Sequence, residues 1–110
     1  MTPYLFVYGT LRRAARTKWS RELEAASDFV SNGRTQGLLI QLHGYRGMTP
    51  SDDPNAWVDG ELHRLHDPAA MLPMLDAYEG SEFERRVVAV TLDDGTPIDS
   101  WAYIYIGQTS

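Results

Sequence analysis

The chain has 110 residues and a formal net charge of -5, a length suited to one domain, 1–110, built around a single apolar core. It contains no cysteine, which excludes disulfides, thiolate metal sites and a cysteine nucleophile, and no apolar run approaches the roughly 18 residues of a membrane span. The N-terminus lacks a basic segment followed by an apolar one, so we expect no signal peptide, no membrane partner and a cytoplasmic location.

The first half of the chain predicts three strands and a helical segment. Residues 4–8 are aromatic and β-branched, which predicts a buried strand that ends at Gly9. Residues 10–26 are rich in Arg, Ala and Glu, with apolar residues four apart, and predict a helix or helical turns. Between 28 and 42 we expect two strands around the turn signal Ser31-Asn32-Gly33. Gly44 and Gly47 then interrupt the pattern, and residues 50–56 are typical of a surface loop.

The second half predicts a strand, a helix and a hairpin. Residues 57–65 alternate as in a half-buried strand, and Asp67-Pro68 then provides an N-cap and a first helical residue. Pro73 predicts a kink or a division into two short helices, and Gly80 can take the positive φ at which a helix stops. Strands are expected over 85–92 and 97–106, joined by a hairpin turn at 93–96.

These elements indicate an α+β protein that is mostly β. About six strands and two or three short helical segments are expected, and several strands lie far in sequence from any partner. A small mixed β-barrel, or a rolled sheet, with short peripheral helices fits this order best.

The junction Tyr8-Gly9-Thr10-Leu11 is the first candidate for a functional site. Glycine lets the backbone turn sharply after a buried strand, and the N–H groups of Gly9, Thr10 and Leu11 can then form a concave nest for a carboxylate or an oxyanion. The alternative is a tight turn that binds nothing.

Glu79 is the second candidate. It ends the predicted helix, where the helix dipole disfavours a carboxylate, and it follows an apolar stretch, so both effects raise its pKa. A glutamate with a raised pKa can serve as a general base near neutral pH. The alternative is an idle helix-end glutamate; Asp76, expected to be solvated, and Glu82, in a loop, are nearby competitors.

Other chemistries have little support. His43, His63 and His66 do not follow a metal-binding pattern, and the glycines form no phosphate-binding loop, so we expect no metal and no cofactor. Residues 1–46 carry seven Lys/Arg and three Asp/Glu (net +4), whereas residues 47–110 carry three and twelve (net -9). The positive charges include Arg12, Arg13, Arg16, Lys18 and Arg21. A solvated helix face is favoured for them over a nucleic-acid surface, because interleaved exposed aromatic residues are missing.

Four ordered segments together resemble the γ-glutamylcyclotransferase-like (AIG2-like) family. They are Phe6-Val7-Tyr8-Gly9-Thr10-Leu11-Arg12, Val58-Asp59-Gly60-Glu61-Leu62, Leu75-Asp76-Ala77-Tyr78-Glu79-Gly80 followed by Arg85, and Trp101-Ala102-Tyr103-Ile104-Tyr105. The resemblance implies a small β-barrel with a pocket at one end. It also implies a cofactor-free enzyme that releases 5-oxoproline from γ-glutamyl compounds by intramolecular cyclisation.

The resemblance also implies roles for particular residues. Tyr8, Gly9, Thr10 and Leu11 would hold the glutamyl group, with Tyr45 and Arg85 as further substrate-binding residues, and Glu79 would be the catalytic acid/base. Phe83 stands where the family usually has a tyrosine before the arginine, in a shorter loop, and no proline follows Tyr45. These departures concern the identity of the substrate more than the fold. The rival interpretation is a non-catalytic module that binds a small carboxylate.

Overall fold

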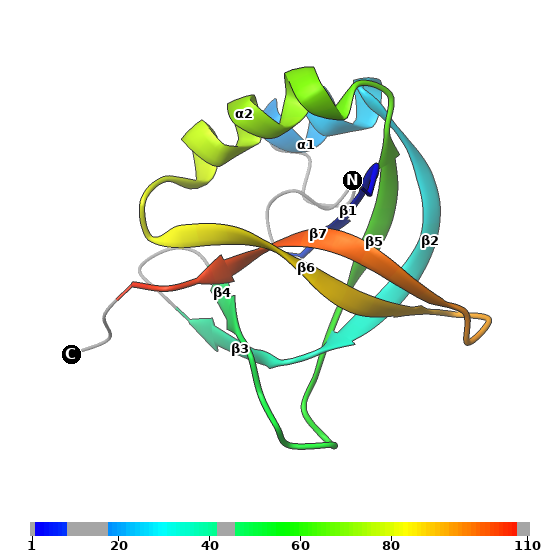
Figure 1. Ribbon diagram of the computed structural model, residues 1–110, viewed down its shortest axis with the longest axis vertical. Helices are drawn as coiled ribbons and strands as arrows, with labels where there is room; N and C mark the ends of the chain where they lie inside the picture. The colour runs from blue at the N-terminus through cyan, green and yellow to red at the C-terminus, as the bar shows by residue number, and fades with distance from the viewer. Residues whose placement is uncertain (1, 9–17, 42–45, 108–110) are drawn as a thin grey trace.

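Seven strands and two helices make up the structure, a computed structural model that describes residues 2–8, 18–41 and 46–107. In chain order they are β1 (Tyr4–Val7), α1 (Lys18–Ala25), β2 (Ser27–Gln36), β3 (Leu38–Gln41), β4 (Arg46–Thr49), β5 (Trp57–Leu65), α2 (Pro68–Glu79), β6 (Phe83–Leu92) and β7 (Pro97–Tyr105). Five strands close a barrel in the order β1-β5-β2-β6-β7, and β3 and β4 pair separately (Figure 1). The predicted mixed barrel with short helices is confirmed.

Strand β1 closes the barrel. It pairs antiparallel with β5, where Val7 lies opposite Glu61, and parallel with β7, where Leu5 lies opposite Trp101. Successive side chains of a strand point to opposite faces, so Leu5 and Val7 join a different apolar cluster from Phe6.

The apolar core accordingly has two layers. One lies between the barrel and the helices and consists of Leu5, Val7, Leu23, Leu65, Met71, Leu72, Leu75 and Tyr103. The other is formed by side chains of the strands and consists of Phe6, Met48, Val58, Leu62, Val90, Ala102 and Ile104. Both helices lie on one side of the barrel in Figure 1. Among the described residues, neither helix is long and apolar enough to cross a membrane.

The turns that depend on local chemistry form as predicted. Asp67 caps α2 by accepting a hydrogen bond from the Ala70 N–H, and Gly80 ends the helix with φ 82°. Gly95 takes φ 88° in the hairpin between β6 and β7. Asp67 acts through its own side chain and the two glycines through their own backbone geometry, and such local effects can be predicted from the sequence.

The predicted turn at Ser31-Asn32-Gly33 is wrong. Strand β2 runs unbroken through these residues, with only a bulge between Phe29 and Ser31. Gly33 serves close packing instead, since a Cβ there would lie 3.0 Å from the Thr91 carbonyl oxygen. The chain bends at Gly37, whose N–H bonds to the Ala56 carbonyl.

Two further expectations need correction. Arg46–Thr49 forms a strand, although its glycine predicted an interruption, because it pairs with Leu38–Gln41. The division of the second helix is also wrong, since α2 runs through Pro73, which is exposed. Proline has no N–H to donate to the carbonyl four residues earlier in the helix, and that carbonyl can bind water instead.

Gly60 permits the close approach of β1 to β5, and replacing it tests this packing. A Cβ at Gly60 would lie 2.6 Å from Phe6 Cζ and closer still to the Val7 carbonyl oxygen. We expect Gly60→Ala to lower the free energy of unfolding by about 3 kcal/mol or more. Gly95→Ala meets no neighbouring atom within 4 Å and should cost about 1–2 kcal/mol through its positive φ alone. Urea unfolding measures both, and equal losses would contradict this account of Gly60.

Candidate active site

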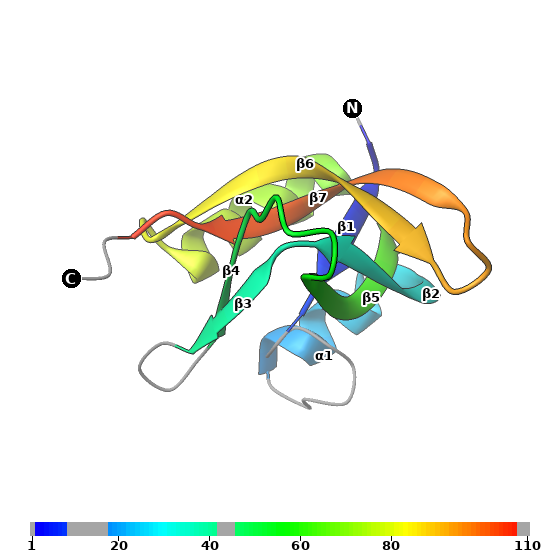
Figure 2. The ribbon, with the colours of Figure 1, turned by 90° about the horizontal axis from the view of Figure 1, so that it is seen from below.

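The end of β1, the last turn of α2 and the strands β4, β6 and β7 meet at one side of the barrel. In Figure 1 the start of β6 and the end of β7 lie at the left, between α2 and β4, and Figure 2 shows β4 beside the same end of β7. Side chains from these elements form the candidate site.

Tyr8 joins three of these elements. Its hydroxyl donates to the Tyr103 carbonyl at 2.6 Å and accepts the Met48 N–H at 3.0 Å. Burial raises the pKa of Tyr8; the Met48 hydrogen bond opposes this rise, and the nearby charge of Glu79 adds to it. Tyr8 therefore stays neutral and fixes the backbone at the end of β1.

Glu79 lies in the last turn of α2 and is half-buried. Burial, which disfavours the carboxylate, raises its pKa from 4.5 to about 7. Its charge also contributes to the raised pKa values of Tyr8 and Tyr103. At neutral pH the Glu79 carboxyl group can both accept and donate a proton, which is what general acid/base catalysis requires.

Asp76, one turn earlier in α2, has the opposite electrostatic behaviour. It accepts hydrogen bonds from Arg85 Nε at 2.9 Å and Nη2 at 3.2 Å, and from the Tyr103 hydroxyl at 2.7 Å. Burial acts to raise the pKa of Asp76, but the hydrogen bonds from Arg85 and Tyr103 outweigh it and lower the pKa. Arg85 also stacks over Trp101, with its Cζ 4.4 Å from the ring centroid. Asp76 is thus ionised and held in place by hydrogen bonds, one helical turn from Glu79, whose carboxyl group can gain or lose a proton near neutral pH.

The structure brings three of the predicted site residues, Tyr8, Glu79 and Arg85, to this side of the barrel. Gly9, Thr10, Leu11 and Tyr45 lie outside the described residues, so their predicted roles stay predictions.

The sequence did not predict that Tyr103 and Asp76 contribute to the site. Tyr103 holds both Tyr8, through its carbonyl, and Asp76, through its hydroxyl. Asp76 is bound to Arg85 and Tyr103, contrary to the expectation of a solvated side chain. The hairpin predicted between 85–92 and 97–106 could have indicated the role of Tyr103, because this pairing places Arg85 opposite Tyr103.

A second polar cluster, Ser27, His63 and Glu61, is buried among β2 and β5. His63 Nε2 lies 3.1 Å from Glu61 Oε1, and its Nδ1 lies 3.1 Å from Ser27 Oγ. The Ser27 hydroxyl donates its single proton to the Leu23 carbonyl at 2.6 Å, so His63 is the donor toward Ser27. His63 therefore does not activate Ser27 as a nucleophile. Within the described part of the chain, no group of three or more His, Asp or Glu could hold a metal ion.

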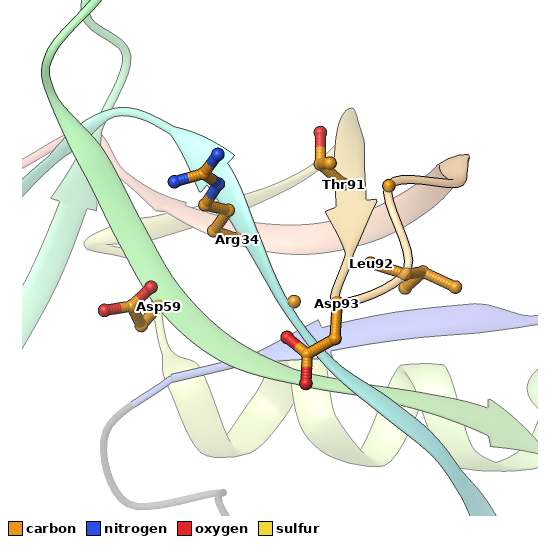
Figure 3. A pocket seen from close by; sticks show the side chains of 7 residues that line it. Arg34, Asp59, Thr91, Leu92 and Asp93 are labelled. Atoms are coloured by element: carbon orange, nitrogen blue, oxygen red, sulfur yellow. The ribbon is translucent and has the colours of Figure 1, made fainter.

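An open cleft of about 340 Å³ lies away from Glu79, where β2, β5 and the end of β6 meet. Figure 3 shows Arg34, Asp59, Thr91, Leu92 and Asp93 along it. Leu92 ends β6 and Phe83, near Glu79, begins it, which separates the two regions by about 30 Å of strand. The Arg34 guanidinium is stacked on Trp57, 4.7 Å from the ring centroid. The Glu79 side of the barrel, where the raised pKa lies, remains the candidate active site.

The fold and site define a small mixed barrel with a protonatable glutamate at its edge. A family model for "Gamma-glutamyl cyclotransferase, AIG2-like" matches residues 5–110, and the chain belongs to this family. The resemblance found in the sequence is confirmed.

Individual relatives agree with this assignment. A Methanocaldococcus jannaschii protein, provisionally named gamma-glutamylcyclotransferase MJ1514, is 27% identical over 105 residues, covering 93% of this chain and 83% of its own. The crystal structure of a mouse AIG2-like protein has a TM-score of 0.79 at 22% identity, covering 97% of this chain and 79% of that one. A structure named Gamma-glutamyl cyclotransferase has a TM-score of 0.71 at 16% identity, with coverages of 97% and 68%. The structural matches show the fold, and the family supports an enzyme of this kind.

The raised pKa of Glu79 makes a prediction about stability. Because the folded protein holds this proton more tightly than the unfolded chain, the stabilisation is complete below pH 4.5 and is lost as pH rises through about 7. Glu79→Gln keeps a neutral side chain at every pH. We expect it to match the parent near pH 4 and to be more stable by roughly 1–3 kcal/mol at pH 8.

Urea unfolding at the two pH values measures this difference. Glu24→Gln, an exposed change on α1, is the control for the loss of one negative charge. A Glu79→Gln effect that is independent of pH would contradict the assignment.

Proposed function

We propose that the protein is a cofactor-independent γ-glutamylcyclotransferase that releases 5-oxoproline from a γ-glutamyl amine or a related γ-glutamyl compound. The observation that carries this proposal is Glu79, a half-buried glutamate with a pKa of about 7 beside the end of β1, in a member of this family. The cytoplasm is the expected location, and a small molecule rather than nucleic acid or membrane is the expected partner.

Glu79 is the proposed general acid/base. Its carboxylate takes a proton from the α-ammonium group of the substrate, and the freed amine attacks the γ-carbonyl carbon. The new C–N bond closes the five-membered ring, and the bond from the γ-carbon to the leaving amine then breaks. The two protons lost from the α-ammonium match the two gained by the amine as it leaves as an ammonium ion. The reacting groups belong to one molecule, so positioning supplies much of the catalysis.

Substrate binding is assigned to the segment that begins at Tyr8. The two hydrogen bonds of the Tyr8 hydroxyl fix the backbone from which this segment starts. We propose that the N–H groups of Gly9, Thr10 and Leu11 hold the carboxylate of the glutamyl group, with Tyr45 as a wall of the pocket. Arg85 is retained as a substrate-binding residue, because its bonds to Asp76 leave other guanidinium N–H groups for a substrate.

A non-catalytic module for a small carboxylate is the alternative, since the same amide nest would bind a glutamate-like ligand without turnover. The raised pKa of Glu79 favours the enzyme, because a binding module gains nothing from a proton acceptor poised near neutral pH.

Glu79→Gln should lower the rate of 5-oxoproline release by about 100-fold or more, because it removes the proton acceptor while keeping the shape. In the parent, kcat/KM should rise with pH through about 7 as the carboxylate forms. Glu24→Gln is the matched control and should keep the parent rate. Equal turnover by a folded Glu79→Gln variant would remove Glu79 from the mechanism.

Gly9→Val tests the proposed amide nest. The larger side chain should block close approach of a carboxylate and abolish calorimetric binding of 5-oxoproline, whereas Thr10→Ser should bind almost as the parent does. Undiminished binding by folded Gly9→Val would place the carboxylate elsewhere.

A further inference from the structure

The last turn of α2 holds two carboxyl groups with different surroundings. Asp76 and Glu79 are three residues apart and therefore lie on neighbouring parts of the helix surface. The Asp76 carbonyl also accepts the Gly80 N–H, so the backbone of Asp76 takes part in ending the helix. Any change in the charge of Asp76 occurs within one helical turn of Glu79.

Asp76 fixes and neutralises Arg85. The bidentate pair joins α2 to β6, and the side chain of Arg85 is 23% exposed whereas that of Asp76 is 42% exposed. Because Arg85 also stacks on Trp101, its guanidinium has a second support that does not depend on Asp76. Loss of the Asp76 charge would therefore leave an uncompensated cation near this position.

Tyr103 connects this pair to Glu79. Its hydroxyl donates a hydrogen bond to Asp76. Burial is the largest cause of the raised pKa of Tyr103, and the charges of Asp76, Arg85 and Glu79 also act on this pKa. The charge of Glu79 adds to the raised pKa values of Tyr8, at the end of β1, and of Tyr103, on β7. Both stay neutral, so Asp76 and Arg85 are the charged pair of this cluster and their charges cancel.

Among residues 2–8, 18–41 and 46–107, the other charged side chains next to this cluster are exposed. Glu84 and Arg86 alternate with Arg85 along β6 and pair with each other on the opposite face, where they are exposed. Glu82 is exposed in the turn before β6, and Tyr105 on β7 packs edge-on against Phe83. Within the described part of the chain, Asp76 and Arg85 are therefore the charged pair that meets beside the last turn of α2.

We propose that Asp76 is a positioning residue that neutralises Arg85 and so keeps an uncompensated positive charge away from Glu79. It acts through Arg85 and Tyr103 and does not touch the substrate. The consequence for catalysis rests on the proposed role of Glu79, but the electrostatic effect itself can be measured without turnover.

Opposite substitutions in the pair should move the pKa of Glu79 in opposite directions. Asp76→Asn removes a negative charge and releases Arg85, so it should lower the pKa of Glu79 by about 0.5 to 1. Arg85→Gln leaves the Asp76 charge unpaired, so it should raise the pKa by a similar amount. The double variant should restore the parent value, and Tyr103→Phe, which changes no charge, should have a smaller effect than either single variant.

NMR titration of the side-chain carboxyl carbon of Glu79, assigned by its loss in Glu79→Gln, measures these shifts. Shifts of the same sign in Asp76→Asn and Arg85→Gln, or no shift in either, would overturn the proposal, because a merely structural role disturbs Glu79 without regard to charge. If Asp76→Asn does not fold, Arg85→Gln decides the question through the sign of its shift.

Measuring 5-oxoproline release beside the NMR titration separates this proposal from the proposed function. Opposite NMR shifts in a protein that releases no 5-oxoproline would support the role of Asp76 and reject the enzyme. Turnover by the parent without opposite shifts would support the enzyme and reject the role of Asp76.

Discussion

The insertion of β1 between β5 and β7 is the constraint on which the structure depends. This strand closes the barrel with four residues, and Gly60 leaves the space that its backbone occupies. Leu5 and Val7 then face the helices while Phe6 faces the other apolar layer, so one short strand joins both parts of the core. The same insertion sets Tyr8 against β4 and β7 through its hydroxyl. The candidate site therefore lies at the end of the strand that closes the barrel.

The candidate site contains two carboxyl groups within one helical turn whose pKa values shift in opposite directions. Asp76 receives three hydrogen bonds and stays ionised, whereas burial favours the protonated form of Glu79. Environments that drive the pKa values of neighbouring acids apart are a common way to assign one acid to support and another to proton transfer. The buried Ser27–His63–Glu61 cluster has a different character, because the Ser27 proton is directed to a backbone carbonyl.

Sequence patterns predict the features of this protein that depend on local chemistry. The alternation in Trp57–Leu65, the Asp67 cap, the Gly80 stop and the helix-end position of Glu79 are all visible along the chain. The turn predicted at Gly33 does not form, because the small size of this residue serves packing against a distant strand, and a glycine needed for packing looks the same in the sequence as one needed for a turn. The β4 strand forms by pairing with β3, and the Asp76–Arg85 pair depends on how α2 meets β6. Such contacts between distant residues follow from the fold, so they could not be predicted from periodicity. The single-domain organisation over 1–110 stays a prediction.

Product formation by the unmodified protein tests the central claim most directly. The protein would be incubated at pH 7.5 with γ-glutamyl compounds that differ only in the leaving amine, and 5-oxoproline would be measured by mass spectrometry against a reaction without protein. We expect release from at least one compound, together with an equal amount of the free amine. Binding of these compounds with no 5-oxoproline from any of them would contradict it and favour the non-catalytic binding module.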